Sequence, residues 1–372
     1  MARLLAAGAI VIGKTQMGPL ATTRATTPDG VVTTVNAWTP GDPRVDPGGS
    51  STGSATAVAG RLAASSVGTQ TGGSITAPAN AQNLTGLKPT MGRVSLYGIV
   101  PLSYTRDHPG PLARDALDAA LMLSVIAGPD PSDARTQGLP PVPDLVRAGT
   151  PVRRGGAVRV RRRTRLGVTP GYLDGTAPAA AARRAMLAAL AGVGVDVVDV
   201  TLPAEWELLT GSEFNNVRLP ERTEAFLEYL KTDLKLFGVS LTGWMNGLFL
   251  SGDEWLKGQR AKLVLLRRVL DGLFAQCDVV VQDDPVPFDI IGLPELGFPI
   301  GFGTDAITGL EVPLGAILGA PPYEEDRLLE VVAGYQAVTD WHTRRPPDPA
   351  PVTLRARRRL RLSLEEAAAQ SE

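Results

Sequence analysis

Two serines set among glycines are the residues of this chain whose types and spacing indicate chemistry. Ser50 lies in Pro47-Gly48-Gly49-Ser50-Ser51-Thr52-Gly53-Ser54, and Ser74 ends Gly68-Thr69-Gln70-Thr71-Gly72-Gly73-Ser74. A serine becomes a nucleophile only when a base removes its proton and donors hold the oxyanion that it creates. Glycines let the backbone aim several N–H groups at one place. The candidate donors are the N–H groups of Thr71, Gly72, Gly73 and Ser74.

The stretch between these serines supports a common site. A single glycine–serine stretch is typical of an ordinary loop. Here the apolar run Ala55 to Val67 joins two of them, and its small residues predict a buried helix over residues 55–65. We therefore expect both serines to be positioned by one element of the core.

Composition allows a large core and limits the kinds of partner. The chain has 372 residues, of which 44% are hydrophobic, enough for one or two domains. A formal net charge of −1 favours neither a nucleic acid nor an anionic membrane as partner, and no apolar run reaches the length of a membrane span. Cys277 is the only cysteine, so no intramolecular disulfide can form and a cytoplasmic location is allowed. Its neighbours predict a buried strand cysteine rather than a nucleophile.

Other catalytic chemistries find little support. A Ser-His-Asp triad would have to use His108 or His342, and a structural role is favoured for both. The sequence contains no His-Glu-x-x-His, paired Cys-x-x-Cys or Gly-x-x-x-x-Gly-Lys-Ser/Thr pattern. We therefore expect no metal and no cofactor.

The order of elements indicates a layered α/β fold. Helices are predicted over residues 111–127, 177–193 and 326–342 and across most of 205–275; strands are predicted over 9–12, 84–90, 195–200 and 279–282. The first residues could be mistaken for a signal peptide, but a helix ended by Gly8 and followed by a strand is the preferred interpretation. Arg153 to Arg165 predicts a solvated loop or an edge strand. Residues 344–372 predict a tail with room for one exposed helix.

Several motifs together resemble the amidase signature family. The resemblance covers residues 1–343, which are expected to form one domain. Its central block is the most specific part. The matching segments are Ala7–Met17, Gly48–Ser54, Gly68–Ser74, Gly86–Ser95, Asp107–Arg114, Gly292–Gly301 and Pro313–Gly315.

The resemblance implies a fold and a reaction. The fold would be a mixed central sheet with helices on both faces. The reaction would be hydrolysis of a carboxamide by a serine–serine–lysine triad, without cofactor or metal. Ser74 would be the acyl nucleophile, and Ser50, on a cis peptide after Gly49, would relay a proton. Thr71, Gly72, Gly73 and Ser74 would form the oxyanion hole, with Gly49, Ser51 and Gln70 as supporting residues. The expected partner is a small-molecule amide, in the cytoplasm, and a homodimer is allowed.

The chain departs from the family at three places. The family's catalytic lysine lies upstream of the turn that Lys14 matches, and Lys88 matches a strand lysine, so no residue here matches the catalytic one. The expectation is either a lost N-terminal segment or a degenerate enzyme, with turnover lower by about 10⁴–10⁶-fold. Gln70 replaces a frequent aspartate. Thr76 stands where many members carry arginine, which weakens the case for an anionic substrate.

Two other functions remain open. One is a catalytically inactive binding protein that keeps the fold. The other, less favoured, is the A subunit of an amidotransferase that amidates aminoacyl-tRNA with partner subunits. The acyl pocket would be formed by residues 130–275. Its aromatic residues fit core packing better than a pocket lining. They are Trp206, Phe214, Tyr229, Phe237, Trp244, Phe249 and Trp255.

Overall fold

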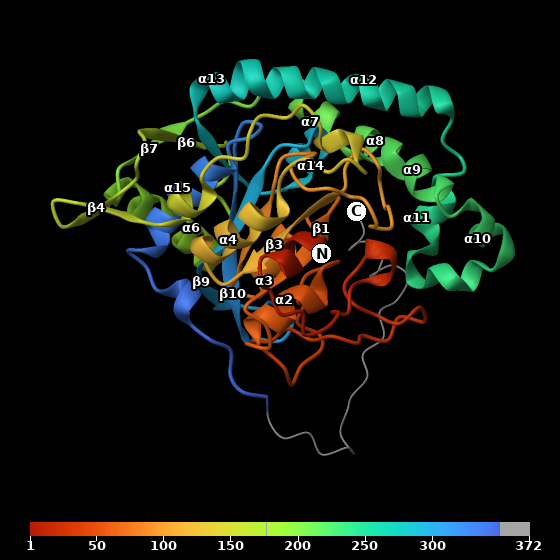
Figure 1. Cartoon of the computed structure of the whole chain (residues 1–372), viewed down its shortest axis with the longest axis horizontal. Helices are drawn as coiled ribbons and strands as arrows, with labels where there is room; N and C mark the ends of the chain where they lie inside the picture. Colours follow the sequence, from red (N-terminus) through yellow and green to blue (C-terminus); the bar gives the residue numbers. More distant parts are fainter. Residues whose placement is uncertain (176, 350–372) are drawn as a thin grey trace.

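One mixed sheet crosses the molecule. The computed structural model describes residues 1–175 and 177–349, and within them eight strands pair in the order β1-β3-β2-β9-β10-β8-β6-β7 (Figure 1). The pairs from β1 to β8 are antiparallel, whereas β6 is parallel to both β8 and β7. The strands are β1 Ser65–Gln70, β2 Thr85–Lys88, β3 His108–Ala113, β6 Thr164–Val168, β7 Val195–Asp199, β8 Val279–Gln282, β9 Glu295–Thr304 and β10 Glu311–Gly319.

Helices cover both faces of this sheet, as predicted. Neighbouring strand residues point to opposite faces, so Val279 and Val281 join one core cluster while Val280 joins another. The first cluster packs α4, α5, α6 and α15 on one face, and the second packs α12 and α14 on the other. The main helices are α2 Thr52–Ala59, α3 Thr76–Ala81, α4 Ala116–Ile126, α5 Leu145–Gly149, α6 Ala177–Gly192, α12 Gly252–Arg268, α14 Val286–Ile291 and α15 Glu325–Gln336.

The segment between β7 and β8 is helical, as predicted. It forms a run of short helices and then α12, the long helix at the top of Figure 1. A capping box between Ser251 and Glu254 fixes the start of α12, because it satisfies free N–H groups of the first turn. The short elements are α7 Trp206–Thr210, α8 Ser212–Asn215, η3 Asn216–Arg218, α9 Leu219–Glu224, α10 Leu227–Thr232, η4 Leu234–Ser240, α11 Leu241–Asn246, η5 Val269–Leu273 and α13 Phe274–Gln276.

One prediction near the front of the chain is wrong, and a second is right except for where the helix begins. Helix α1 (Ala2–Ala6) is present with Gly8 beyond its end, but residues 9–12 form no strand. They pair with no other described strand, and Ile10 is 88% exposed. The helix predicted over 111–127 begins only at Ala116, because the residues before it form β3, which is buried between β1 and β2.

Other expectations are met in part. The buried helix after Ser50 ends at Ala59, before residue 65. The helix predicted over 326–342 ends at Gln336, and His342 lies in the short turn η6 (Trp341–Thr343). The arginine-rich stretch forms an exposed ribbon of β4 (Val152–Arg154) and β5 (Ala157–Arg159) before β6. The tail beyond residue 349 lies outside the described residues, and no described helix is long and apolar enough to cross a membrane.

Candidate functional site

The loop that carries Ser50 is tightly enclosed. The Gly49–Ser50 peptide bond is cis, the isomer that the resemblance implied. A Cβ at Gly49 would lie 2.7 Å from the main chain of Arg24, so only glycine fits there. Ser50 is 2% exposed, and its Oγ has no hydrogen-bond partner among the described residues. The side chain is therefore buried with its hydroxyl unused.

The loop that carries Ser74 lies directly beside it. It follows β1 and turns through Gly73, whose φ is +84°. The N–H of Ser51 donates to the main-chain oxygen of Ser74 at 3.4 Å. The structure thus brings the two serine loops together, although Ser51 and Ser74 are 23 positions apart in the sequence.

Ser51 and Ser54 fasten α2 to β1. Ser51 Oγ donates to the main-chain oxygen of Thr69 and accepts from its N–H, both at 3.1 Å. Ser54 Oγ donates to the main-chain oxygen of Val67 at 2.9 Å. These bonds fix the helix that follows Ser50 against the strand that leads to Ser74.

Gln70 is the centre of a buried hydrogen-bond network behind Ser74. Its Oε1 accepts from the N–H groups of Ile75 and Thr76, both at 2.9 Å. Its Nε2 donates to Asp289 Oδ1 at 3.0 Å and to Glu295 Oε2 at 2.9 Å. One side chain therefore holds the backbone that follows Ser74 and ties it to α14 and β9.

Lys88 supplies the positive charge of this network. Its Nζ lies 3.4 Å from both Asp289 Oδ1 and Glu295 Oε2, and all three side chains are fully buried. Burial raises the pKa of Glu295 well above its ordinary value. Sequence analysis missed both acids. The signal was a lysine inside an apolar strand, because a buried ammonium needs nearby carboxylates.

The four candidate oxyanion donors are not equivalent. The N–H of Gly73 donates to Asp289 Oδ2 at 2.8 Å and is engaged in holding the loop. Among the described residues, the N–H groups of Thr71, Gly72 and Ser74 have no acceptor. Three donors therefore remain for a developing negative charge.

One surface hollow is lined in part by Asp107, which hydrogen-bonds to the Ser74 loop. It has a volume of about 470 Å³ and is lined by residues 96–99, 101, 104, 107 and 132–135. Asp107 links it to the loop, since Thr71 Oγ1 donates to Asp107 Oδ1 at 2.6 Å. Burial raises the pKa of Asp107 above its ordinary value. This hollow is the candidate entrance for a substrate.

No lysine or histidine in the described part of the chain hydrogen-bonds to either serine. Lys88 serves the buried network, and Lys262 donates to the main-chain oxygen of Thr105 at 2.7 Å. His108 is buried in β3; its Nδ1 lies 2.5 Å from the main-chain oxygen of Arg106, and burial lowers its pKa. The structure thus gives Ser50 no base among these residues.

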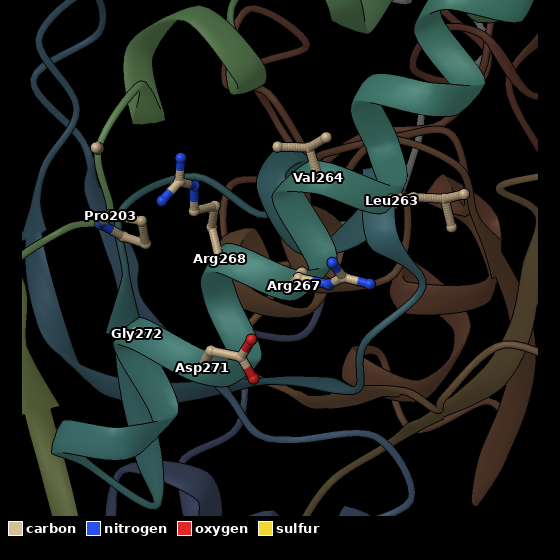
Figure 2. Close-up of a pocket in the computed structure, with 8 residues that line it drawn as sticks. Pro203, Leu263, Val264, Arg267, Arg268, Asp271 and Gly272 are labelled. Atoms are coloured by element: carbon tan, nitrogen blue, oxygen red, sulfur yellow. The ribbon is translucent and has the colours of Figure 1, made fainter.

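Alternative centres are weaker. Cys277 is buried, and burial raises the pKa of its thiol to about 12, so it is a poor nucleophile. No group of three or more potential metal-ligating side chains gathers within the described residues. Figure 2 shows a separate hollow of about 660 Å³ on the outer face of α12 and η5, where Leu263 and Val264 project from the helix. Neither serine loop lines it.

Comparison with known proteins gives concordant matches. The sequence model described as Amidase matches residues 1–283. The chain is 33% identical to the A subunit of glutamyl-tRNA(Gln) amidotransferase from Ralstonia nicotianae, covering 92% of this chain and 78% of that protein. The corresponding protein of Roseiflexus castenholzii is 35% identical, over 93% of this chain and 76% of that protein.

Solved structures agree with these matches. 6-Aminohexanoate cyclic dimer hydrolase superposes with a TM-score of 0.75 at 26% identity, covering 93% of this chain and 78% of its own. The peptide amidase of Stenotrophomonas maltophilia superposes with a TM-score of 0.70 at 27% identity, covering 94% of this chain and 77% of its own.

Proposed function

The chain belongs to the amidase family, and on that premise we propose that it hydrolyses a carboxamide through an acyl intermediate on Ser74. Ser74 Oγ attacks the amide carbon, and the carbon–nitrogen bond then breaks. The serine proton passes through Ser50 to the leaving nitrogen, which departs as ammonia or an amine. Water then cleaves the acyl ester and restores the serine.

One observation supports this proposal: the Ser51 N–H donates to the Ser74 main-chain oxygen, so the loop that carries Ser50, whose hydroxyl has no partner among the described residues, adjoins the Ser74 loop. The N–H groups of Thr71, Gly72 and Ser74 would stabilise the oxyanion. In other hydrolases, loss of one such donor costs about 10²–10³-fold in turnover. Gly73, Gln70 and Ser51 would hold the loops.

We include in the proposal that this protein turns its substrate over slowly. Ser50 Oγ meets no base among the described residues. Without a base the serine pair stays protonated near neutral pH, and the expected loss of turnover is about 10⁴–10⁶-fold. We also place the protein in the cytoplasm, which its single cysteine allows.

The test is covalent trapping with a fluorophosphonate probe, followed by peptide mass spectrometry. We expect a slowly formed adduct on Ser74 that is lost in Ser74→Ala and kept in Ser124→Ala, a control on the exposed side of α4. Added methylamine should accelerate labelling in proportion to its concentration, because it replaces the missing base. Rapid labelling without amine would refute the impairment, and no adduct with amine would favour a non-catalytic binding protein.

The curated relatives favour a second candidate function. They are A subunits of an amidotransferase that acts on glutamyl-tRNA(Gln), so this chain would work with protein partners. Co-purification of the chain with the remaining subunits of such an enzyme tests this. Failure to form a complex, together with hydrolysis of a free amide, would exclude it.

A further inference from the structure

Three arginines are buried together beside the candidate site. Arg106 precedes β3, Arg218 ends η3 and Arg222 lies in α9, and all three are at most 5% exposed. A guanidinium cannot shed its charge readily, so burial is costly unless acceptors surround it. The hydrogen-bond acceptors around each guanidinium therefore indicate which of these arginines has a structural role.

Two of the three have acceptors in the fold. Arg106 Nη1 donates to Asn215 Oδ1 at 2.6 Å. Arg218 Nη1 donates to the same oxygen at 2.8 Å and to the Asn215 main-chain oxygen at 2.6 Å. Asn215 thus joins η3 to the segment before β3.

Arg222 is different. Its Nε is buried without a partner, and no nitrogen of its guanidinium donates a hydrogen bond to any described residue. The ring of Trp244 lies 5.5 Å away, and Nη1 fills the space that a Cβ at Gly243 would need. Burial lowers the pKa of Arg222 to about 9, yet it stays largely protonated at neutral pH.

The nearby carboxylates are already engaged. Asp107, which interacts electrostatically with Arg222, accepts from the N–H groups of Leu102 and Ser103 and from Thr71 Oγ1. The carboxylate of Glu221, the preceding residue of α9, is used by uncharged donors. These donors are Ser103 Oγ, Thr105 N, Thr105 Oγ1, Trp255 Nε1 and Gln259 Nε2.

Contacts on two sides place this region against both serine loops. Glu221 holds the segment 103–105, and Asp107 just beyond it holds Thr71. From the other side, Ser240 Oγ lies 2.5 Å from Thr22 Oγ1, in the segment whose Gly18 N–H donates to the Ser50 main-chain oxygen. Figure 1 shows α10 and α11 beside this N-terminal segment.

We propose that Arg222 binds a carboxylate of the substrate, so that the substrate is an amide that carries a second, ionised carboxyl group. The planar guanidinium matches a carboxylate with two parallel hydrogen bonds. The proposal rests on the proposed amidase function. The presence of Thr76 instead of an arginine two residues after Ser74 weakened the expectation of an anionic substrate. The proposal revises that expectation, because Arg222 in α9 would supply the positive charge.

Thermal unfolding in the presence of dicarboxylates tests this without turnover. Glutarate should raise the Tm of the wild-type chain and of Ser74→Ala by several degrees, whereas butyrate at the same ionic strength should not. Arg222→Met should weaken glutarate binding by at least about tenfold, with partial recovery in Arg222→Lys. Arg163→Met, in an exposed ion pair, is the matched control and should bind like wild type.

The unliganded variants separate binding from a structural role. An arginine kept for a ligand leaves the free protein no less stable when it becomes methionine, so Arg222→Met should keep or raise Tm without glutarate. A lower Tm with unchanged glutarate affinity would overturn the proposal. So would equal stabilisation by butyrate and glutarate, or no stabilisation by either. Glutarate binding without any Ser74 adduct would instead refute only the catalytic function.

Discussion

The network behind Ser74 and the arginine in α9 are both buried, but they differ in how their charges are met. Lys88 faces two carboxylates, and Gln70 links those carboxylates to the backbone after Ser74. Arg222 meets an aromatic ring and no acceptor within the described residues. Buried charges with full sets of partners hold a loop in one geometry. A buried charge left without acceptors is poised for a ligand.

Breaking the paired network should have the largest effect. Asp289→Ala leaves Lys88 with one carboxylate and the Gly73 N–H without its acceptor. We expect the free energy of unfolding to fall by about 3–5 kcal/mol and Ser74 labelling to disappear. Urea unfolding followed by circular dichroism measures this. The control is Asp283→Ala, whose exposed carboxylate pairs with Arg183; equal losses in the two variants would contradict the assignment.

A change of charge at the centre of the network should cost somewhat less. Gln70→Glu keeps the shape and the acceptor for Ile75 and Thr76, but removes the N–H groups that face Asp289 and Glu295. We expect a loss of about 2–3 kcal/mol that shrinks at low pH, where the new carboxyl is protonated. The same urea measurement at two pH values checks this. A loss independent of pH would show that charge is not its cause.

The next prediction concerns Lys262, which donates to the main-chain oxygen of Thr105 between the two regions. Burial lowers its pKa from 10.5 to about 8, so between these values the unfolded chain holds a proton that the folded chain has released. The free energy of unfolding should therefore rise with pH across this window, by about 3 kcal/mol from this group. In Lys262→Met that contribution disappears. Parallel pH dependence in the two proteins would show that the lysine titrates normally.

An exposed ion pair should have the smallest effect. Arg163 lies 2.7 Å from Asp196 with 85% of its side chain exposed. Solvent and salt screen such pairs. Arg163→Gln should leave both Tm and Ser74 labelling unchanged. A clear fall in Tm would mean that the ion pair between Arg163, just before β6, and Asp196 of β7 contributes more to the fold than its solvent exposure indicates.

Sequence reasoning was strongest where the signal is local. The spacing of glycines around Ser50 and Ser74 indicated both loops, and alternation of helices and strands indicated a layered α/β fold; the mixed sheet was an implication of the family resemblance. It failed at residues 9–12, because a strand forms only beside a partner. It also failed at β3, where Pro109 and Pro111 argue against a strand, yet both lie opposite β1 in the sheet.

Local sequence patterns could not predict which distant residues hold the Ser74 loop. Asp289 and Glu295 lie 219 and 225 positions after Gln70, and nothing in their immediate neighbours links them to it. Arg222 was equally hidden, because a short helix with charged residues predicts a solvated face. Such roles depend on how distant segments meet, which only tertiary structure reveals.

Gln70 lies far in the sequence from its hydrogen-bond partners, and this distance determines the order in which the site can form during protein synthesis. Gln70 and Glu295 are 225 residues apart, and Gly73 and Asp289 are 216 residues apart. A nascent chain emerges from the ribosome from its N-terminus at about 5–20 residues per second, so both serines are exposed long before these acids. The Ser74 loop acquires its hydrogen bonds to Asp289, and through Gln70 to Glu295, only when the sheet is nearly finished. A chain released before Asp289 would therefore display both serines but lack the geometry in which they work.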